Sequence, residues 1–456
     1  MPLQKNQVLT LRVERLSSDG SGVAHSPDGE TVFIPGAAPG DEARVRIVKD
    51  CKRYAFGILD EVLTPSPDRI PVDCAVAGPC GGCSLRHLDY AAELRAKQEN
   101  VADAFARIGG LDVPVLPIVG SPEVNRYRNK VQFPVGVDKN GVPCIGFYAG
   151  RTHRIVPCPD CRLQPGVLNE IGNALCAFFA EKGIQPYSEE TGRGLVRHIF
   201  LRRGAHSGQI MVCLVCTRAK LPSAEELCTR LKAQFAEITT ILLNVNAKNT
   251  NVILGTETHT LYGQGYIEDT LCGVPVQLGP LSFYQVNTLA AEQLYGIAAQ
   301  YAQLTPDDLL LDLYCGMGTI GLSMAAHCRE LIGVEIVPEA IESAKANAAR
   351  MGTDVAAKSR FFCADAGQAA TRLAAEGLHP DIVMLDPPRK GCDEATLSAV
   401  VRMSPRRVVY VSCNPATAAR DAAWLEQNGY HAEKVQPVDL FPRTRHCECV
   451  LSLSKV

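Results

Sequence analysis

The sequence predicts a multidomain protein with a small N-terminal β-barrel, a central α+β region and a C-terminal doubly wound α/β domain. The 456 residues are too many for one ordinary hydrophobic core. Short strand patterns separated by turn residues fill the N-terminal stretch, and strands alternate regularly with helices from Thr305 onward. We therefore expect domains over residues 1–63, 64–275 and 276–456.

The N-terminal stretch has the two-residue period of half-buried strands. Leu11 and Val13 alternate with polar residues, and Asp19-Gly20 and Asp28-Gly29 supply turns at short spacing. Several short strands with such turns are typical of a small barrel of the OB type, a scaffold that often binds nucleic acid. The run Thr64–Pro67 contains two prolines and predicts a linker after the barrel.

The central region mixes strands and helices. One helix is expected from Tyr90 to Ile108, and another over Ser223–Phe235, where Ser223 and Glu226 have the spacing of a capping box. The predicted strands are Val131–Val137, His198–Arg203, Ile210–Cys216 and Thr240–Val245. This pattern indicates an α+β region but does not disclose its function.

The C-terminal region alternates strands with helices. The predicted strands are Leu309–Leu313, Leu331–Glu335, Arg360–Cys363, Ile382–Leu385, Arg407–Val411 and a last one near Val450. Such alternation predicts a largely parallel sheet, in which ligands bind beyond the carboxyl ends of the strands.

Composition is that of a soluble globular protein, with 46% hydrophobic and 21% charged residues. No apolar run is long enough to span a membrane, and the first residues lack the apolar core of a signal peptide, so we expect a cytoplasmic protein without a membrane partner. In a reducing compartment, the 19 cysteines favour metal binding, catalysis or packing over disulfides. The net charge of −3 excludes a uniformly basic surface but allows local basic patches such as Lys49–Arg53 and Arg126–Lys130.

The first C-terminal strand runs into the glycine-rich loop LDLYCGMGTIGL. Gly316, Gly318 and Gly321 satisfy the G-x-G-x-x-G fingerprint, and Glu335 ends the next strand, where an acid can bind ribose hydroxyls. The fingerprint suits a nicotinamide cofactor as well as S-adenosylmethionine. Asp312, which precedes the loop, favours S-adenosylmethionine, because an acid there can bind the amino-acid tail of the methyl donor.

Two further motifs follow later strands. The loop LDPPRKG contains two prolines that stiffen it, and it presents Asp386 at the edge of the sheet. The segment VVYVSCNPAT delivers Cys413 to the end of the next strand. A free cysteine is usually a small buried hydrophobe, but the position at a strand end favours a site shared by Asp386 and Cys413.

Cys413 and a downstream acid have a joint use beside a methyl donor. Glu448 precedes the terminal apolar strand, which can return it to the ends of its neighbours. A thiolate that adds to C6 of uracil makes C5 nucleophilic toward a sulfonium methyl group, and a carboxylate then removes the C5 proton so that the thiolate leaves. We expect the helix after Pro415 to lower the pKa of the thiol below the ~8.5 of free cysteine.

A cysteine-rich segment suggests a metal centre. Cys74, Cys80 and Cys83 lie within ten residues, and two glycines separate the last pair. Such thiols suit a closed, structural iron–sulfur or zinc site with four thiolate ligands. Candidates for a distant fourth ligand are Cys161, Cys158 and Cys144.

Taken together, these motifs resemble the RNA uracil-C5 methyltransferases, in particular the branch that acts on 23S ribosomal RNA. The resemblance covers nearly the whole chain, through a TRAM-like barrel and the segments CGGCSLRHLDY, YRNKVQF, SFYQVN, DLYCGMG, DPPRKG, YVSCNPAT and FPRTRHCE. SCNP with a downstream HxE at this distance is highly specific, whereas the glycine loop is not.

The resemblance implies a Rossmann-like, S-adenosylmethionine-dependent domain in which Cys413 is the nucleophile and Glu448 the base. It implies that the residues around the methyl donor are Gln285, Tyr314, Glu335 and Asp386, and that a [4Fe–4S] cluster is held by Cys74, Cys80, Cys83 and Cys161. The protein is then expected to be a monomer that methylates C5 of a specific uridine in 23S ribosomal RNA. Its local basic clusters would bind RNA whose target base is turned out into the site.

Alternatives remain open at this point. A transfer-RNA uridine-C5 methyltransferase fits the same motifs. An amino-directed adenine methyltransferase would use DPPR, but it leaves Cys413 and Glu448 without a role and has Arg389 in place of a stacking aromatic residue. An NAD-dependent oxidoreductase would use the glycine fingerprint, and a non-catalytic RNA-binding module would use only the barrel and the cluster.

Overall fold

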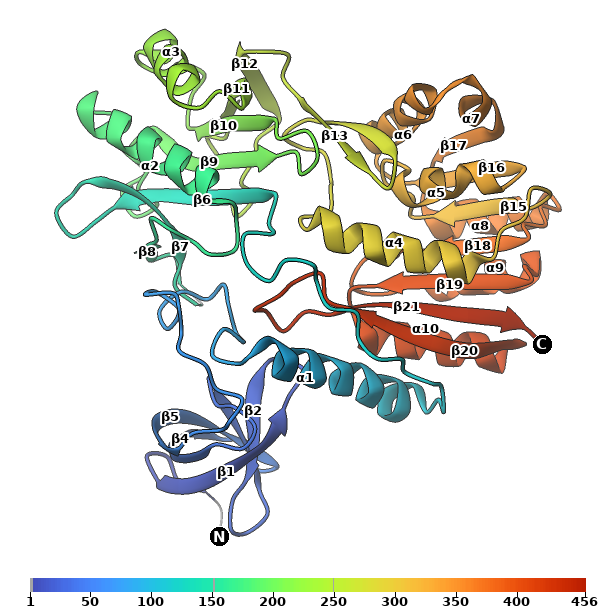
Figure 1. The fold of residues 1–456 in the computed structure, drawn as a ribbon, viewed down its shortest axis with the longest axis horizontal. Helices are drawn as coiled ribbons and strands as arrows, with labels where there is room; N and C mark the ends of the chain where they lie inside the picture. Colours follow the sequence, from blue (N-terminus) through green and yellow to red (C-terminus); the bar gives the residue numbers. More distant parts are fainter. Residues whose placement is uncertain (1–2, 151, 249) are drawn as a thin grey trace.

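The computed structural model describes residues 3–150, 152–248 and 250–456. Figure 1 shows the N-terminal barrel at one end of the molecule, with the central and C-terminal sheets beside each other and the C terminus at the far edge of the C-terminal sheet. The expected multidomain architecture is confirmed.

The barrel is closed, with strand order β1-β2-β3-β5-β4. Its strands are β1 (Val8–Leu16), β2 (Ser21–His25), β3 (Thr31–Pro35), β4 (Glu42–Asp50) and β5 (Tyr54–Thr64). Leu11 and Val13, which set the two-residue period, lie in its core. Gly57 lets β5 approach β4, because a Cβ atom there would lie 2.3 Å from Cγ1 of Val45. The predicted small barrel is confirmed.

The central sheet has the order β12-β11-β10-β9-β6-β7-β8. Its strands are β6 (Lys130–Val137), β7 (Pro143–Tyr148), β8 (Ile155–Pro157), β9 (Val196–Arg203), β10 (Ile210–Cys216), β11 (Ile238–Val245) and β12 (Glu257–Tyr262). Helices α2 (Gly166–Glu181) and α3 (Ala224–Gln234) pack against each other and on this sheet around one apolar core. All four strands that the sequence predicted in this region are present.

The capping box predicted at the start of α3 is wrong. Ser223 has the left-handed backbone angles φ 54° and ψ 34°, and its side chain makes no capping hydrogen bond. A capping side chain reaches the first-turn amides from an extended backbone, which Ser223 lacks. The acids Glu225 and Glu226 in the first turn still favour the helix through its dipole.

The C-terminal sheet has the order β17-β16-β15-β18-β19-β21-β20. Its strands are β15 (Leu309–Leu313), β16 (Glu330–Glu335), β17 (Ser359–Cys363), β18 (Ile382–Leu385), β19 (Arg407–Ser412), β20 (Tyr430–Val438) and β21 (Glu448–Lys455). Strands β15 to β19 are parallel, and β21 runs antiparallel to β19 and β20. The doubly wound fold class is confirmed. The sequence did not predict the edge strand β20, because charged residues interrupt the period of its apolar side chains.

Helices cover both faces of this sheet. They are α4 (Thr288–Ala302), α5 (Thr319–Met324), α6 (Pro338–Met351), α7 (Thr353–Lys358), α8 (Ala366–Ala375), α9 (Glu394–Met403) and α10 (Pro415–Gln427). The hairpin of β13 (Ile267–Leu271) and β14 (Val274–Leu278) shares one core with α4, while α9 and α10 contribute to the core on the opposite face.

Helix α1 (Tyr90–Asp103) and the segment after it pack on the C-terminal sheet. A π-helical turn, Ala104–Gly109, extends the helix, and Phe105 lies in the core beside α10. Farther along, Val115 pairs with Val435 of β20 in a parallel bridge. Figure 1 shows α1 beneath the red strands of this sheet. A segment from the first quarter of the chain thus supports the last two strands.

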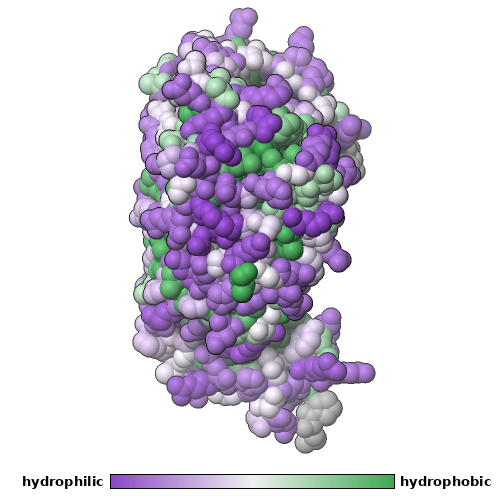
Figure 2. Space-filling view, turned by 90° about the vertical axis from the view of Figure 1, so that its right-hand side faces the viewer, coloured by the Kyte–Doolittle hydropathy of each residue, from purple (hydrophilic) through white to green (hydrophobic). Residues whose placement is uncertain are grey.

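Apolar side chains are concentrated in these cores. Figure 2 looks onto the right-hand side of Figure 1, where hydrophilic side chains cover most of the face and apolar ones form small separate patches. Isolated exposed apolar residues are ordinary on protein surfaces. Within the described part of the chain, no helix combines the length and apolar composition of a membrane span.

Candidate active site

Three neighbouring parallel strands carry predicted site residues to one edge of the C-terminal sheet. Leu313 of β15 lies opposite Val334 of β16 and Leu385 of β18. The residues that directly follow these three are Tyr314, Glu335 and Asp386. Ligands bind at this edge in open parallel sheets. The register therefore assembles a candidate site from residues far apart in the sequence.

Cys413 and Glu448 meet through the antiparallel pair β19–β21. Ser412 lies opposite Cys449, so one further step of the register puts Cys413 opposite Glu448. Cys413 is half-buried, whereas Glu448 is only 5% exposed. A thiol and a carboxyl group thus face one another beside the strand end that carries Asp386.

Burial raises the pKa of both carboxyl groups in this site. Burial raises the pKa of Glu448 to about 8, with a further contribution from the charge of Asp386, while Arg389 opposes the rise. Burial also raises the pKa of Asp386 to about 7, although this residue keeps some contact with solvent. Protonated and ionised forms are therefore both accessible near neutral pH.

The thiol does not follow the expectation from the sequence. Burial raises the pKa of Cys413, and the charge of Glu448 raises it further, while a hydrogen bond with Arg389 lowers it. The net direction is upward, so the predicted lowering by α10 is wrong for the protein without RNA. Asn414 caps α10 by accepting a hydrogen bond from the Ala416 N–H.

The loop after β15 has a left-handed backbone conformation at three positions. The angle φ is 68° at Tyr314, 56° at Gly316 and 80° at Gly318. Glycine adopts these angles without penalty, whereas a residue with a side chain pays about 1 kcal/mol or more. The strained Tyr314 stands at the site edge, where its hydroxyl lies 3.4 Å from Oγ1 of Thr396.

Asp312 is buried at the end of β15 with one of its two carboxylate oxygens unsatisfied. Oδ2 accepts a hydrogen bond of 3.0 Å from the Gly321 N–H, while Oδ1 has no partner among the described residues. Burial raises the pKa of this carboxyl group to about 8, and Asp386 and Glu335 add to the rise. A buried acceptor without a partner costs about 1–3 kcal/mol. The orphaned oxygen therefore fits a ligand donor such as an ammonium group.

Glu335 is oriented by the backbone around it. Its Oε2 accepts a hydrogen bond of 3.2 Å from the Gly316 N–H, and its Oε1 accepts one of 3.0 Å from the Val337 N–H. A carboxylate has about four acceptor positions. Glu335 can therefore accept hydrogen bonds from ligand hydroxyls without losing its backbone partners.

Gln285 lies on the loop between β14 and α4 and not at a strand end. The side-chain amide of Asn129 donates to the Gln285 carbonyl at 2.7 Å, which ties this loop to the central region. The Gln285 side chain hydrogen-bonds the hydroxyl of Tyr295, which also hydrogen-bonds Thr319. Tyr295 also interacts electrostatically with Asp386. Gln285 is therefore linked to Asp386 through Tyr295.

Two residues of the site received no role from the sequence. Arg389 interacts with both Cys413 and Glu448, and it is the cation beside the thiol. Its position in DPPRKG, three residues after Asp386, was a readable signal for this placement. Tyr295 lies inside α4 in no recognisable motif, so only the packing of α4 brings it to the site.

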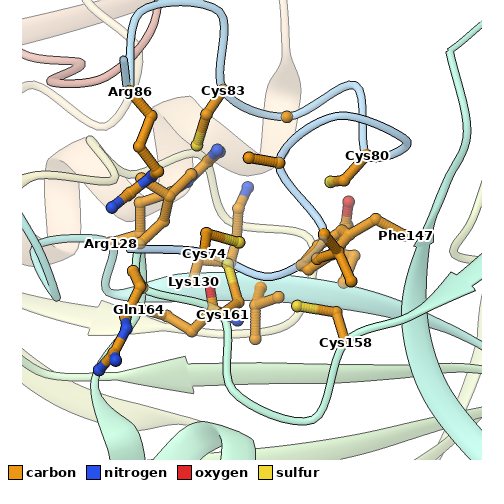
Figure 3. Close-up of a pocket in the computed structure, with 17 residues that line it drawn as sticks. Cys74, Cys80, Cys83, Arg86, Arg128, Lys130, Phe147, Cys158, Cys161 and Gln164 are labelled. Atoms are coloured by element: carbon orange, nitrogen blue, oxygen red, sulfur yellow. The ribbon is translucent and has the colours of Figure 1, made fainter. Parts of the chain in front are cut away.

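A cavity of about 210 Å³ lies between the cysteine-rich loop and the central sheet. The thiols that line it are those of Cys74, Cys80, Cys83, Cys158 and Cys161. Figure 3 shows Cys80 and Cys83 entering from one loop, while Cys158 and Cys161 enter from another. Cationic side chains also line it, and Arg86 hydrogen-bonds Cys83. All four predicted cluster ligands thus line one cavity, whereas Cys144 does not line it.

The cysteines do not form a coordination shell around one ion. In the described ranges, no group of three or more His, Cys, Asp or Glu side chains is arranged to hold a metal ion. The thiols line the cavity, and Cys158 and Cys161 hydrogen-bond each other. The predicted metal binding and the predicted [4Fe–4S] cluster are therefore not supported by the arrangement of these side chains.

The largely parallel sheet, its left-handed glycine turn and the buried acid near the end of β15 define the C-terminal region as a Rossmann-like methyltransferase domain, attached here to an OB-type barrel. The chain belongs to the tRNA (uracil-5-)-methyltransferase family, whose model matches residues 89–456. A TRAM domain model matches residues 2–59, over the barrel. The protein is thus an S-adenosylmethionine-dependent RNA methyltransferase of the uracil-5 family.

Similar proteins cover the whole chain. An uncharacterized RNA methyltransferase of Halalkalibacterium halodurans is 43% identical over 453 residues, which are 99% of this chain and 98% of that protein. Another, from Clostridium tetani, is 40% identical over 454 residues, with coverage of 100% and 98%. The crystal structure of the Pyrococcus abyssi tRNA (uracil-54, C5)-methyltransferase with S-adenosyl-L-homocysteine has a TM-score of 0.77 and 26% identity, and covers 98% of this chain and 100% of that one.

Proposed function

We propose that the protein acts as a monomer and methylates C5 of a specific uridine in 23S ribosomal RNA through a covalent adduct with Cys413. The observation that carries the proposal is the cross-strand placement of Cys413 and Glu448 beside Asp386 and Arg389. A nucleophile and a base at the ligand edge of the sheet are what C5 methylation of uracil requires. The motifs shared with the 23S branch support the choice of ribosomal RNA.

Cys413 begins the reaction as a thiolate that adds to C6 of the uracil. Arg389, which hydrogen-bonds the sulfur, stabilises that thiolate. The electron pair of the C5–C6 double bond moves toward the C4 carbonyl, and the resulting enolate attacks through C5. S-adenosylmethionine, when bound, supplies the methyl group as an electrophilic sulfonium. C5 now carries both the methyl group and its original proton.

Glu448 completes the reaction as a carboxylate. It removes the C5 proton, the electron pair restores the C5–C6 double bond, and the sulfur of Cys413 leaves C6. The raised pKa of Glu448, about 8, makes it a stronger base than an ordinary carboxylate. Burial beside Asp386 thus favours the step that releases the methylated RNA.

The donor is held by residues at the same edge. The unpartnered Oδ1 of Asp312 fits the ammonium group of the donor, and Glu335 fits its ribose hydroxyls. Tyr314, Asp386 and Gln285 complete the surroundings of the donor. These placements rest on the orphaned oxygen and the backbone-oriented carboxylate described above.

RNA binding must compensate for turning the target base out of its stack, which costs about a few kcal/mol. The barrel offers Lys52 and Arg53, both exposed, in the loop between β4 and β5. Phosphate contacts by such residues are independent of sequence and weaken with salt. The barrel is therefore proposed to supply affinity, while the C-terminal domain supplies the chemistry.

The test of this function uses 23S and transfer-RNA transcripts tritiated at uracil C5. Donor-dependent tritium release from the 23S transcript alone is the expected result. Release from transfer RNA instead would assign the alternative substrate. Binding of RNA without methyl transfer would identify a non-catalytic RNA-binding module and overturn the proposal, and methyl transfer without tritium release would move the target atom away from C5.

Two variants assign the catalytic roles. Cys413→Ala is expected to abolish adduct formation and tritium release, because no nucleophile reaches C6. Glu448→Gln is expected to form the methylated adduct but to slow its release by about 10²–10⁴-fold. Cys449→Ala is the matched control, since Cys449 is a neighbouring thiol that is fully buried in the core. Turnover in Cys413→Ala at the native rate would contradict the mechanism.

We also propose that the cysteine-lined cavity holds a [4Fe–4S] cluster on Cys74, Cys80, Cys83 and Cys161. A cluster carries inorganic sulfide and iron between its thiolates, so its ligands stand around a volume and do not converge on one point. The cavity of about 210 Å³ has this character. Arg86 lines the cavity beside Cys83, where its guanidinium group can donate to cluster or thiolate sulfur.

Chemical analysis tests the cluster directly. Anaerobically purified protein is expected to contain iron and acid-labile sulfide in equal amounts, and the Cys83→Ser variant is expected to lose both. Cys144→Ser is the control, because Cys144 does not line the cavity. Zinc without sulfide would identify a different metal centre. A metal-free protein would show that the cysteines of the cavity are free thiols and would overturn the cluster proposal.

A further inference from the structure

The loop that leads into Glu448, residues 439–447, is held largely by segments from elsewhere in the chain. Lys97 of α1 donates to Asp439 Oδ1 at 2.7 Å. The Tyr127 hydroxyl donates to the Pro442 carbonyl at 2.9 Å, and Asn287 donates to the Leu440 carbonyl at 3.1 Å. The position of this loop therefore depends on α1, on the segment before β6 and on the start of α4.

Arg443 is the most constrained residue of this loop. Its backbone has a φ of 69°, in the left-handed region. Its N–H donates to Glu93 Oε1 at 2.7 Å, and its Nη1 donates to the Leu88 carbonyl at 2.7 Å. Its carbonyl accepts hydrogen bonds of 3.1 Å from the N–H groups of both Ser84 and Leu85. Such strain, about 1 kcal/mol or more, persists only where the surroundings hold it in place.

The two amides that hold the Arg443 carbonyl belong to the cysteine-rich loop. Ser84 and Leu85 directly follow Cys83, and Arg86 hydrogen-bonds the Cys83 thiol. Both ends of this short segment, Cys83 and Arg86, therefore line the cavity, while the two residues between them bind the Arg443 carbonyl. Glu448 lies five positions after Arg443 in the chain.

We propose that Arg443 is a positioning residue that couples the order of the cysteine-lined loop to the placement of Glu448. The inference rests on the proposed role of Glu448 as the base that resolves the adduct. If the segment after Cys83 shifts, the Arg443 carbonyl loses both of its donors and its strained backbone relaxes. The loop then no longer delivers Glu448 to C5, although Cys413, which directly follows β19, keeps its place.

This arrangement predicts which chemical step depends on the cysteine cavity. Attack by Cys413 and methyl transfer use β19 and the donor residues, so they persist when the cavity loop is disordered. Removal of the C5 proton uses Glu448, so it slows. A perturbed cavity is therefore expected to trap RNA on Cys413 as a methylated adduct and not to abolish its formation.

The first experiment compares Arg443→Ala with Arg443→Lys, which keeps a positive charge and a donor for the Leu88 carbonyl. We expect Arg443→Ala to slow tritium release by about 10–100-fold and to accumulate adduct in single-turnover reactions with 23S transcript. We expect Arg443→Lys to restore most of the rate, and donor affinity to be unchanged in both. A fall in adduct formation that parallels the fall in release would overturn the positioning role.

Hydrogen exchange measured by mass spectrometry tests the coupling in both directions without using activity. In Arg443→Ala, the peptide with Ser84 and Leu85 is expected to exchange faster, because the backbone carbonyl that accepts from both amides is no longer held in place by the guanidinium contact with Leu88. In Cys83→Ser, the peptide covering residues 439–447 is expected to exchange faster, since coupling between sites is reciprocal. Unchanged exchange of that peptide in Cys83→Ser would overturn the proposal.

The Glu448→Gln variant distinguishes a failure of the positioning role of Arg443 from a failure of the proposed catalytic role of Glu448. If Glu448→Gln traps adduct but Arg443→Ala does not, the mechanism stands and the positioning role fails. If Glu448→Gln forms no more adduct than the native protein, the assignment of the base fails first. Faster exchange in both hydrogen-exchange variants, together with trapping in Glu448→Gln and Arg443→Ala, is the result expected if both hold.

Discussion

At the scale of single residues, Glu448 combines burial with a proposed function that requires negative charge. Its pKa is raised from the ordinary 4.5 to about 8 by burial and by Asp386. An environment that favours the protonated carboxylic acid over the carboxylate also makes the carboxylate a stronger base. Catalytic sites commonly hold such groups, at a cost in stability.

The pH dependence of the rate follows from this shift. Both the Cys413 thiolate and the Glu448 carboxylate are deprotonated forms, and the pKa of each group is raised. We expect kcat/KM to rise with pH from about pH 6 and to level off only above about pH 8. The measurement is tritium release across this range, with donor affinity determined at each pH. A rate independent of pH in this range, at constant donor affinity, would contradict the assigned pKa directions.

The same shift makes Glu448 a source of instability at alkaline pH. A carboxyl group with a raised native pKa contributes stability that is complete below pH 4.5 and is lost as pH rises through about 8. We expect Glu448→Gln to raise the free energy of unfolding of the C-terminal domain by about 1–3 kcal/mol near pH 9. The gain should shrink as pH falls toward 5.

Thermal unfolding at several pH values measures this effect. The exposed acid Glu342 on α6, changed to Gln, serves as the control, because its side chain is 72% exposed. Equal stability of native and Glu448→Gln protein at high pH would show that the carboxylate is solvated in the folded state.

At the scale of elements, one buried charge network ties α1 to the loop before β21. Lys97 donates to Glu93 Oε1 and to Asp439 Oδ1, each at 2.7 Å, and all three side chains are at most 1% exposed. The Tyr90 hydroxyl donates to the other oxygen of Asp439 at 3.0 Å. Such a network specifies one position of α1, since any shift would leave a charge buried without a partner.

Removal of the central cation should therefore be costly. Lys97→Ala leaves two buried carboxylates beside each other. We therefore expect the free energy of unfolding of the C-terminal domain to fall by about 3–5 kcal/mol. Arg95→Ala, on the same helix, removes an exposed pair with Asp68 and should cost less than about 1 kcal/mol. Denaturant unfolding followed by Trp424 fluorescence distinguishes them, because Trp424 lies in α10 against the same core. Equal costs would mean that the network is hydrated.

At the scale of the whole molecule, the barrel stands apart from the C-terminal sheet (Figure 1), and we propose that it contacts RNA through its own charged residues. The net charge of −3 makes the contact depend on local patches and not on the overall charge. This division predicts that RNA affinity and donor affinity can be changed separately.

Charge reversal in the barrel tests this separation. Lys52→Glu with Arg53→Glu is expected to weaken RNA binding and to lower the slope of log Kd against log salt by about 1–2, because phosphate contacts are lost. Donor affinity should not change. Lys345→Glu on α6 is the matched control, since this exposed lysine lies in the C-terminal region and not in the barrel. RNA affinity equal to that of the native protein would exclude this loop from the contact.

The sequence by itself determined the elements whose pattern is local. The two-residue period of β1, the strand and helix alternation after Thr305 and the glycine turn after Asp312 were all readable, because side-chain period and backbone freedom act over a few residues. The motifs around Asp386 and Cys413 were readable for the same reason, since each follows its strand directly.

Only the tertiary structure decided the features that depend on distant contacts. These are the register that sets Glu448 opposite Cys413, the burial that raises the pKa of both groups and the packing of α1 against β20. The predicted cap at Ser223 failed for a related reason. Serine is a suitable capping residue, but the backbone at Ser223 is left-handed, so its side chain makes no capping hydrogen bond. Local sequence sets which conformations a segment favours, whereas register, burial and electrostatic environment exist only after segments far apart in the chain have packed together.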